Sequence, residues 1–273
     1  MHKLIIFAIM HIHLFEFTDQ SWCPRIIRQY MTDYLHFLIT KGKIYKPAIP
    51  IIKEIIDKTG IDELIDLCSG SGGGVDILQK ELSKLCGKEI KVTLSDKYPN
   101  IEPFDILKNN SNGGLDYLKE PVDALHVPKH LKGIRTMFSA FHHFKPEQAK
   151  AILQDAVNNN IPICIFEGAG KRVLDFMGML LFHSIIFIVV TPFIKPFRIS
   201  RLFLTYIIPI VPITTVWDGL VSILRMYTPK DMLKMAKEIG AWNRRAENYE
   251  WKAEQIKGKF GNRVMYIVGY PVN

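Results

Sequence analysis

The stretch that most constrains the fold of this chain runs from Glu63 to Leu78. An apolar run with Asp66 near its end breaks into four glycines among small residues, and apolar residues then recur at helical spacing from Val75. This order predicts a strand, a tight turn and a helix. Glycines suit such a turn because a backbone that turns sharply beside a ligand has no room for a Cβ atom. The stretch therefore predicts the opening of a nucleotide-binding α/β unit.

The spacing of the glycines favours one family over another. A dinucleotide fingerprint, G-x-G-x-x-G, would start at Gly70 and Gly72, but its third glycine falls on Val75, which disfavours an NAD-dependent oxidoreductase. The segment instead resembles motif I of the class I (Rossmann-like) S-adenosylmethionine (SAM) methyltransferases, with Asp66, Cys68, Gly70 and Gly72 in its pattern. Cys68 departs from the usual first glycine, since a residue with a Cβ does not readily take a φ above zero. A glycine-rich turn of another α/β protein is the alternative.

The resemblance implies an α/β fold with a seven-stranded, mostly parallel sheet whose last strand is antiparallel. With 273 residues, 48% of them hydrophobic, the chain can build one large domain with an elaboration. It is similar to uncharacterised bacterial methyltransferases of the small-molecule type. We expect four segments: an N-terminal helical cap (1–46), a SAM-binding core (47–171), an apolar helical insertion or lid (172–227) and a C-terminal helix with the last two strands (228–273). Those strands are expected at 245–252 and 263–270, joined by a loop at 257–261.

The cofactor of such a protein is SAM, and the sequence offers residues to hold it. Asp96 ends a β-branched strand roughly 20 residues beyond the glycines, where nucleotide-binding units place a carboxylate that accepts hydrogen bonds from ribose hydroxyls. An aspartate that caps a turn is the alternative. The resemblance also implies that Asp123 and Ala124 lie against adenine, with the Asp123 carboxylate accepting the exocyclic amino group. The full expected set is Asp66, Cys68, Gly70, Ser71, Gly72, Asp96, Asp123, Ala124 and Ser139.

Three further side chains are candidates for catalysis. His142 and His143 follow the predicted fourth strand, and Glu167 ends the fifth. Open α/β sheets bind ligands outside the carboxyl ends of their strands, so these side chains should border the methyl-transfer site. A neutral imidazole, whose ordinary pKa is near ~6.5, could take a proton from a hydroxyl as it attacks the methyl group. Glu167 is a second candidate for substrate contact, and a structural role for either histidine is the alternative.

The insertion is the least ordinary part of the sequence. Residues 173–216 hold two apolar runs separated by Lys195, Arg198 and Arg201. The first run reaches the roughly 20 residues that span a bilayer, but the second is interrupted by prolines. We expect a lid-like helical hairpin that packs over the active site or dips into one leaflet, with its basic turn toward lipid phosphates. A fully buried helix pair is the alternative.

Composition narrows the partners and the compartment. The net charge is +8, but the basic residues form no single cluster and no Asn-Pro-Pro-Tyr-like tetrapeptide follows the fourth strand, so nucleic acid is not expected as a partner. Four cysteines without a C-x-x-C pair predict reduced thiols and a cytoplasmic protein, with peripheral contact at the inner membrane face. No metal set is visible, because the histidines lack nearby carboxylate or cysteine partners at helical spacing. The apolar run after Met1 is at the lower limit for a signal peptide, and Met10 is another candidate start.

The sequence thus predicts a SAM-dependent methyltransferase. The expected acceptor is a lipophilic small molecule, methylated on oxygen or carbon, near a membrane surface. Two other functional classes stay open at this point. One is a non-catalytic, membrane-associated SAM-binding protein, and the other is the NAD-dependent oxidoreductase that Val75 disfavours.

Overall fold

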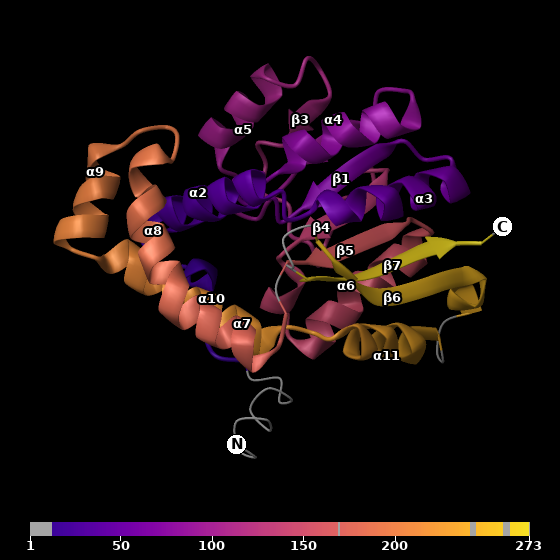
Figure 1. Ribbon diagram of the computed structural model, residues 1–273. Helices are drawn as coiled ribbons and strands as arrows, with labels where there is room; N and C mark the ends of the chain where they lie inside the picture. The colour runs from indigo at the N-terminus through magenta and orange to yellow at the C-terminus, as the bar shows by residue number, and fades with distance from the viewer. Residues whose placement is uncertain (1–12, 169, 241–243, 259–262, 273) are drawn as a thin grey trace.

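A computed structural model describes residues 13–168, 170–240, 244–258 and 263–272. Its seven strands form one sheet in the order β3-β2-β1-β4-β5-β7-β6 (Figure 1). Strands β1 to β5 are parallel, and β7 runs antiparallel to both β5 and β6. This confirms the predicted mostly parallel sheet with an antiparallel last strand. The strands are β1 (Glu63–Leu67), β2 (Lys91–Leu94), β3 (Leu115–Tyr117), β4 (Ile134–Phe138), β5 (Ile163–Glu167), β6 (Tyr249–Lys257) and β7 (Arg263–Pro271).

Helices cover both faces of the sheet because each presents one apolar stripe to it. On one face lie α3 (Ile49–Thr59), α4 (Val75–Cys86) and α5 (Ile101–Asn109), which share a buried cluster with the strands. On the other face lie α6 (Pro146–Asn159) and α11 (Pro229–Gly240), with a second cluster. The two layers cover the faces of the sheet, and the carboxyl ends of the parallel strands lie together at one edge.

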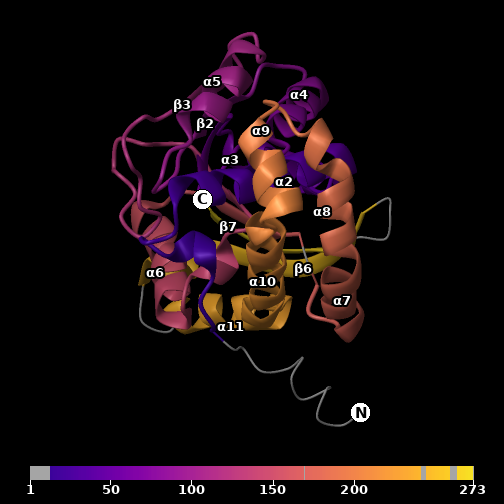
Figure 2. The same ribbon diagram turned by 90° about the vertical axis from the view of Figure 1, so that its left-hand side faces the viewer.

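A third group of helices lies beyond that edge, and we call it the helical layer (Figures 1 and 2). Two turns of π-helix, Met179–His183 and Phe203–Ile207, interrupt it. Such turns are rare and occur often at functional sites. The helical layer consists of α2 (Arg25–Gly42), α7 (Val173–Gly178), α8 (Ser184–Val190), α9 (Ile199–Leu202) and α10 (Ile210–Arg225), with the segments between α7 and α10.

The helical layer is held together by its own core and by buried polar contacts. Tyr30 and Tyr34 of α2 pack against Phe187 of α8, and the Tyr34 and Phe187 ring centroids lie 4.3 Å apart. Asp33 of α2 forms a buried ion pair with Arg201 of α9 at 2.5 Å. The N-terminal helix and the insertion, far apart in the sequence, therefore form one unit.

Two expectations need correction, and others lie outside the described residues. The strand expected at 245–252 starts at Tyr249 and extends to Lys257, because a short 3-10 helix (Arg244–Asn248) precedes it and its register with β7 continues to the pair of Lys257 and Arg263. The basic turn does not face outward as a unit. Arg201 is buried against Asp33 and Arg198 pairs with Glu102, which leaves Lys195 exposed. The apolar run after Met1 and most of the loop at 257–261 lie outside the described residues, and the four-segment division stays a prediction.

Candidate active site

A cavity of about 1120 Å³ lies at the carboxyl edge of the parallel strands, between the strands and α2. Small-molecule sites commonly enclose about 300–1,000 Å³, so this cavity has room for a cofactor and an acceptor together. Of the residues predicted to bind the cofactor, Gly72 lies behind the wall and eight line the cavity: Asp66, Cys68, Gly70, Ser71, Asp96, Asp123, Ala124 and Ser139.

The glycine turn follows β1 and leads into α4. Gly70 has a φ of 58° and Gly72 one of 69°, both in the left-handed region. A Cβ on Gly72 would lie 2.4 Å from Leu107 Cδ1, whereas one on Gly70 would meet no atom within 4 Å. Gly72 therefore permits close packing of the turn on α5, and Gly70 leaves its cavity side open to a ligand. Cys68 also takes a left-handed φ, 58°, so it adopts here the conformation that a residue with a Cβ does not readily take.

Asp96 joins the turn to the end of β2. Its Oδ2 accepts a hydrogen bond from the Gly70 backbone N–H at 2.8 Å, and its Oδ1 accepts one from the Tyr98 N–H at 2.8 Å. A carboxylate has about four acceptor sites, so Asp96 retains two for the hydroxyls of a ribose. The backbone bonds hold the carboxylate in place at the cavity wall, as the predicted role requires.

Asp66 is more deeply buried than Asp96 and lies beneath the glycine turn, at the end of β1. It accepts hydrogen bonds from Ser69 Oγ at 2.7 Å and from Thr136 Oγ1 at 2.8 Å. Burial raises the pKa of its carboxyl to about 7, against the opposing effect of these two bonds. Its contacts are those of a residue that fixes the strand ends and the turn.

The remaining predicted cofactor residues lie along the cavity wall. Asp123 pairs with Lys97 at 2.9 Å and accepts the Leu125 N–H at 3.0 Å. Ser139 directly follows β4 with a φ of 49°, and its Oγ hydrogen-bonds the buried Tyr45 hydroxyl and accepts the Gly168 N–H at 3.3 Å. The Ser139 hydroxyl is therefore engaged with protein groups, so its contact with SAM stays a prediction.

His142 and Glu167 form a buried pair behind the cavity. His142 Nδ1 lies 2.8 Å from Glu167 Oε2, and the His142 backbone N–H donates to Glu167 Oε1 at 3.1 Å. Neither side chain lines the cavity. We expected Glu167 to contact the substrate directly. Its carboxylate instead hydrogen-bonds His142 and does not reach the cavity.

His143 lines the cavity, and carboxylates from the N-terminal segment surround it. Its Nδ1 lies 2.8 Å from Asp19 Oδ1 and 3.2 Å from Glu16 Oε2. Burial lowers the pKa of His143, but Glu16 and Asp19 outweigh this effect and raise it to about 9. His143 is then charged at neutral pH, so in the free protein it is not the neutral imidazole that the sequence interpretation needed.

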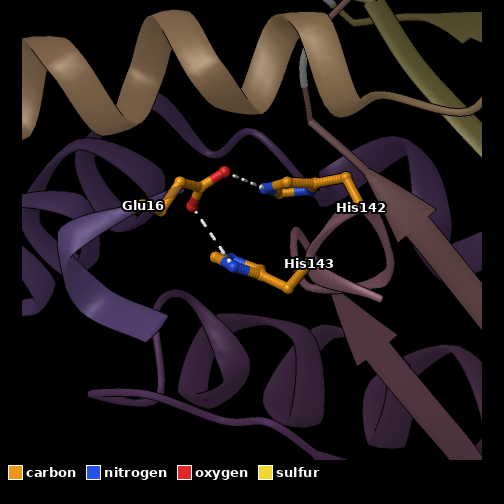
Figure 3. A group of neighbouring side chains, drawn as sticks. All are labelled: Glu16, His142 and His143. Atoms are coloured by element: carbon orange, nitrogen blue, oxygen red, sulfur yellow. Dashed lines mark ion pairs between the residues drawn. The ribbon is translucent and has the colours of Figure 1, made fainter. Parts of the chain in front are cut away.

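Sequence reasoning missed three residues of this cluster. Glu16 faces both imidazole rings, whose centroids lie 4.4 Å apart, and its Oε1 is 4.0 Å from His142 Nε2 (Figure 3). Arg225, at the end of α10, pairs with Asp19 Oδ2 at 2.6 Å and with Glu16 Oε1 at 3.2 Å. Burial opposes the charge of Asp19, but hydrogen bonds with His143 and Arg225 hold its pKa well below its usual range. The whole cluster comes from three distant parts of the chain: the N-terminal segment, the two histidines after β4, and Arg225. No local spacing marks these residues as a group.

Comparison with known proteins places this geometry in a familiar fold. No family model and no curated protein matches the chain. Among solved structures, the plantazolicin methyltransferase BpumL in complex with SAH is similar over 99% of this chain and 98% of its own, with a TM-score of 0.57 and 11% identity. The citrinin polyketide synthase CMeT domain is similar over 85% of this chain and 55% of its own, with a TM-score of 0.50 and 10% identity.

An O-methyltransferase family protein from Burkholderia thailandensis is similar over 89% of this chain, with a TM-score of 0.48 and 8% identity. This chain spans 60% of that protein's length. The chain has the class I SAM-dependent methyltransferase fold, as BpumL shows over nearly the full length of both proteins.

Proposed function

We propose that this protein is a SAM-dependent methyltransferase that methylates an oxygen or carbon atom of a lipophilic small molecule. One observation carries the proposal: the glycine turn, Asp96 and His143 line a single cavity at the carboxyl edge of the sheet. The residues fit SAM, because Asp96 is fixed by two backbone N–H groups with acceptor sites to spare and Gly70 leaves its side of the turn open. BpumL is named as a plantazolicin methyltransferase, and the CMeT domain is named as part of the citrinin polyketide synthase. Both names support a small-molecule acceptor.

The chemistry divides between cofactor and protein. SAM, when bound, supplies an electrophilic methyl group on a sulfonium. The protein aligns the acceptor with that methyl group and excludes water. His143, which reaches the cavity and carries a proton at neutral pH, donates a hydrogen bond to the acceptor. The carboxylate of Asp19, which lines the cavity beside His143 and is 30% exposed, can accept the proton that a hydroxyl acceptor releases and pass it to water.

Isothermal titration calorimetry tests the cofactor. We expect SAM and its demethylated product to bind with micromolar affinity, about 8 kcal/mol, and NADH not to bind. Asp96→Ala should weaken SAM binding at least about 10-fold, since it removes the ribose acceptor. Asp62→Ala is the matched control, because Asp62 precedes β1 at the opposite end of the strand and pairs with exposed Lys88. Binding of NADH without SAM would refute the proposal.

The outer side of the helical layer supports a lipophilic acceptor reached from a membrane. In the described part of the chain, the helix Val173–Phe193 is long and apolar enough to cross a bilayer, and a pair bent by 76°, Ile199–Ile207 with Ile210–Arg225, could form a broken span. Phe182, Ile185 and Val189 share one face of the first helix and are each at least 60% exposed. Full burial of each such side chain contributes about 1.5–3 kcal/mol, so this face favours lipid over water.

The inner side of the helical layer argues for one leaflet instead of a span. Helix α2 packs against α10 and carries Arg28 and Asp33, so a bilayer around the insertion would have to enclose these charges. Helix α2 also lines the cavity through Arg25, Leu35 and Ile39. An in-plane contact places the cavity next to the lipid surface, from which an apolar acceptor can enter. Because the basic turn is largely paired, apolar contact and not charge should dominate.

Flotation with liposomes tests the membrane contact. The intact protein should float with both zwitterionic and anionic vesicles. The triple variant Phe182→Gln, Ile185→Gln and Val189→Gln should stay at the bottom while SAM binding is retained. Its control replaces three exposed apolar residues of the core with Gln: Leu85, Ile106 and Val272. An intact protein that never floats would leave a soluble lid as the better account.

A further inference from the structure

Two histidines and a glutamate come together at the edge of the cavity with their ligand atoms within 4.8 Å of one another. His142 and His143 lie on a short 3-10 helix (Phe141–His143) after β4, and Glu16 comes from the N-terminal segment. Figure 3 shows both imidazole rings directed at the Glu16 carboxylate. Imidazole nitrogens and carboxylate oxygens are the donors that zinc and similar divalent ions prefer.

The charges of the cluster call for cations. Glu16 and Glu167 are fully buried and Asp19 is partly buried, so the cluster holds three carboxylates. In the part of the chain that the structure describes, the guanidinium that pairs with Glu16 and Asp19 is that of Arg225. Arg225 offsets one of these three negative charges. A divalent ion bound in place of a proton on His143 would supply two more positive charges, so that the ion and Arg225 together balance the three carboxylates.

The orientation of His142 is that of a metal ligand. Glu167 takes the Nδ1 side of the ring at 2.8 Å, which leaves Nε2 directed at Glu16 Oε1 across 4.0 Å. That gap is too long for a hydrogen bond. A carboxylate that holds one nitrogen of a histidine while the other faces an ion is the usual support of a metal-ligating imidazole.

The distances fit one ion with a small contraction. Two atoms that bind the same zinc ion at about 2.0–2.2 Å are at most about 4.4 Å apart. Glu16 lies 4.0 Å from His142 Nε2 and 3.2 Å from His143 Nδ1, within this limit. Asp19 Oδ1, 2.8 Å from His143 Nδ1, is the adjacent oxygen for a fourth position.

We propose that Glu16, His142 and His143 bind one divalent transition-metal ion of the zinc class, with Asp19 beside it. His143 and Asp19 line the cavity, so an ion here is within reach of a polar atom of the acceptor. Only this last role rests on the proposed methyltransferase function; binding of the ion does not.

The test is the metal content of the full-length protein. After treatment with a chelator, the protein is equilibrated with Zn²⁺ alone, and bound zinc is measured by mass spectrometry and calorimetry. We expect one zinc per chain, no competition from Mg²⁺, and at least about a 10-fold loss of affinity in Glu16→Gln and in His142→Gln. His130→Gln, an exposed histidine outside the cluster, is the matched control and should bind like the wild type.

Cobalt supplies a readout that does not depend on the variants folding. Co²⁺ bound to the wild-type protein should give visible absorption bands of a site with nitrogen ligands, and Zn²⁺ should displace it. A wild-type protein without stoichiometric zinc, or a folded Glu16→Gln protein with unchanged affinity, overturns the proposal. SAM binding without zinc binding would refute the metal site alone, and zinc binding without SAM binding would refute the methyltransferase alone.

Discussion

The sheet and the helical layer solve the burial problem in opposite ways. In β5 every residue is buried, and the strand ends in Glu167 at the carboxyl edge of the sheet. In the helical layer many apolar residues outside its small core are exposed, with Leu174 at 74% and Ile199 at 77%, whereas Arg201 and Arg225 are buried. The core is therefore stabilised by the area it removes from water, and the helical layer is positioned by directional polar contacts.

This contrast explains why the cavity lies between them. The N-terminal segment is fixed to α10 through Asp218, whose carboxylate accepts the Phe17 and Thr18 backbone N–H groups at 2.7 and 3.0 Å. The same connection brings Glu16 and Asp19 to the histidines at the sheet edge. The core supplies the cofactor residues, the helical layer supplies the wall, and the N-terminal segment with Arg225 of α10 supplies the charges that face them.

The largest effect on stability is expected when the buried ion pair of the helical layer is removed. Asp33→Ala leaves the buried Arg201 guanidinium with backbone carbonyls but without its carboxylate, which should cost about 3–5 kcal/mol in the free energy of unfolding. Urea denaturation measures the loss, and hydrogen exchange should locate it in α2 and α9. Asp155→Ala is the matched change in the core, since Asp155 pairs with buried Arg135 but is itself 30% exposed, so its loss should be smaller.

A second variant shows whether charge or shape holds the layer. The double change Asp33→Leu and Arg201→Met replaces the pair by apolar side chains and should recover most of the stability. Equal losses for Asp33→Ala and Asp155→Ala would show that the two regions do not differ in this respect.

The next largest effect is the pH dependence of stability that Asp66 gives to the core. The pKa of Asp66 is raised to about 7 by burial, against an ordinary value of 3.8, so the folded protein holds this proton more tightly than the unfolded chain. The stability that it contributes is fully present below about pH 4 and is lost as the pH rises through 7, a change of a few kcal/mol. Unfolding free energies of wild type and Asp66→Asn, measured from pH 4 to 8, should be similar near pH 4 and diverge as the pH rises, because only the wild type loses stability. A constant difference would contradict the assignment.

A smaller effect concerns turnover at the boundary between the two regions. His142→Ala should reduce methyl transfer about 100-fold, or ~2.7 kcal/mol, while SAM affinity stays nearly unchanged, because His142 contacts Glu16 and Glu167 but not the cavity. His126→Ala, an exposed histidine, is the control. Parallel loss of stability and of activity would instead favour a structural role for His142.

The same boundary marks what the sequence could predict. The sheet followed from local patterns, since a buried parallel strand needs a continuous apolar run, as in residues 163–167, and a helix end needs Gly60 with its φ of 71°. The partners of Glu16, Asp19 and Arg225 could not be predicted, because their contacts join segments about 125 to 210 positions apart. Local periodicity carries no information on such contacts, so the helical layer was predicted as helices but not as a charged wall.

The smallest expected effect lies in the glycine turn, where Cys68 holds a left-handed backbone conformation. A residue with a Cβ pays about 1–2 kcal/mol there, and glycine does not. Cys68→Gly should therefore raise the free energy of unfolding by about 1 kcal/mol, slightly offset by the loss of a partly buried side chain. Cys86→Gly, in the last position of α4, is the matched control and should lower stability by about the same amount. If both variants lose stability alike, Cys68 is held by its packing against the core and the turn stores no strain.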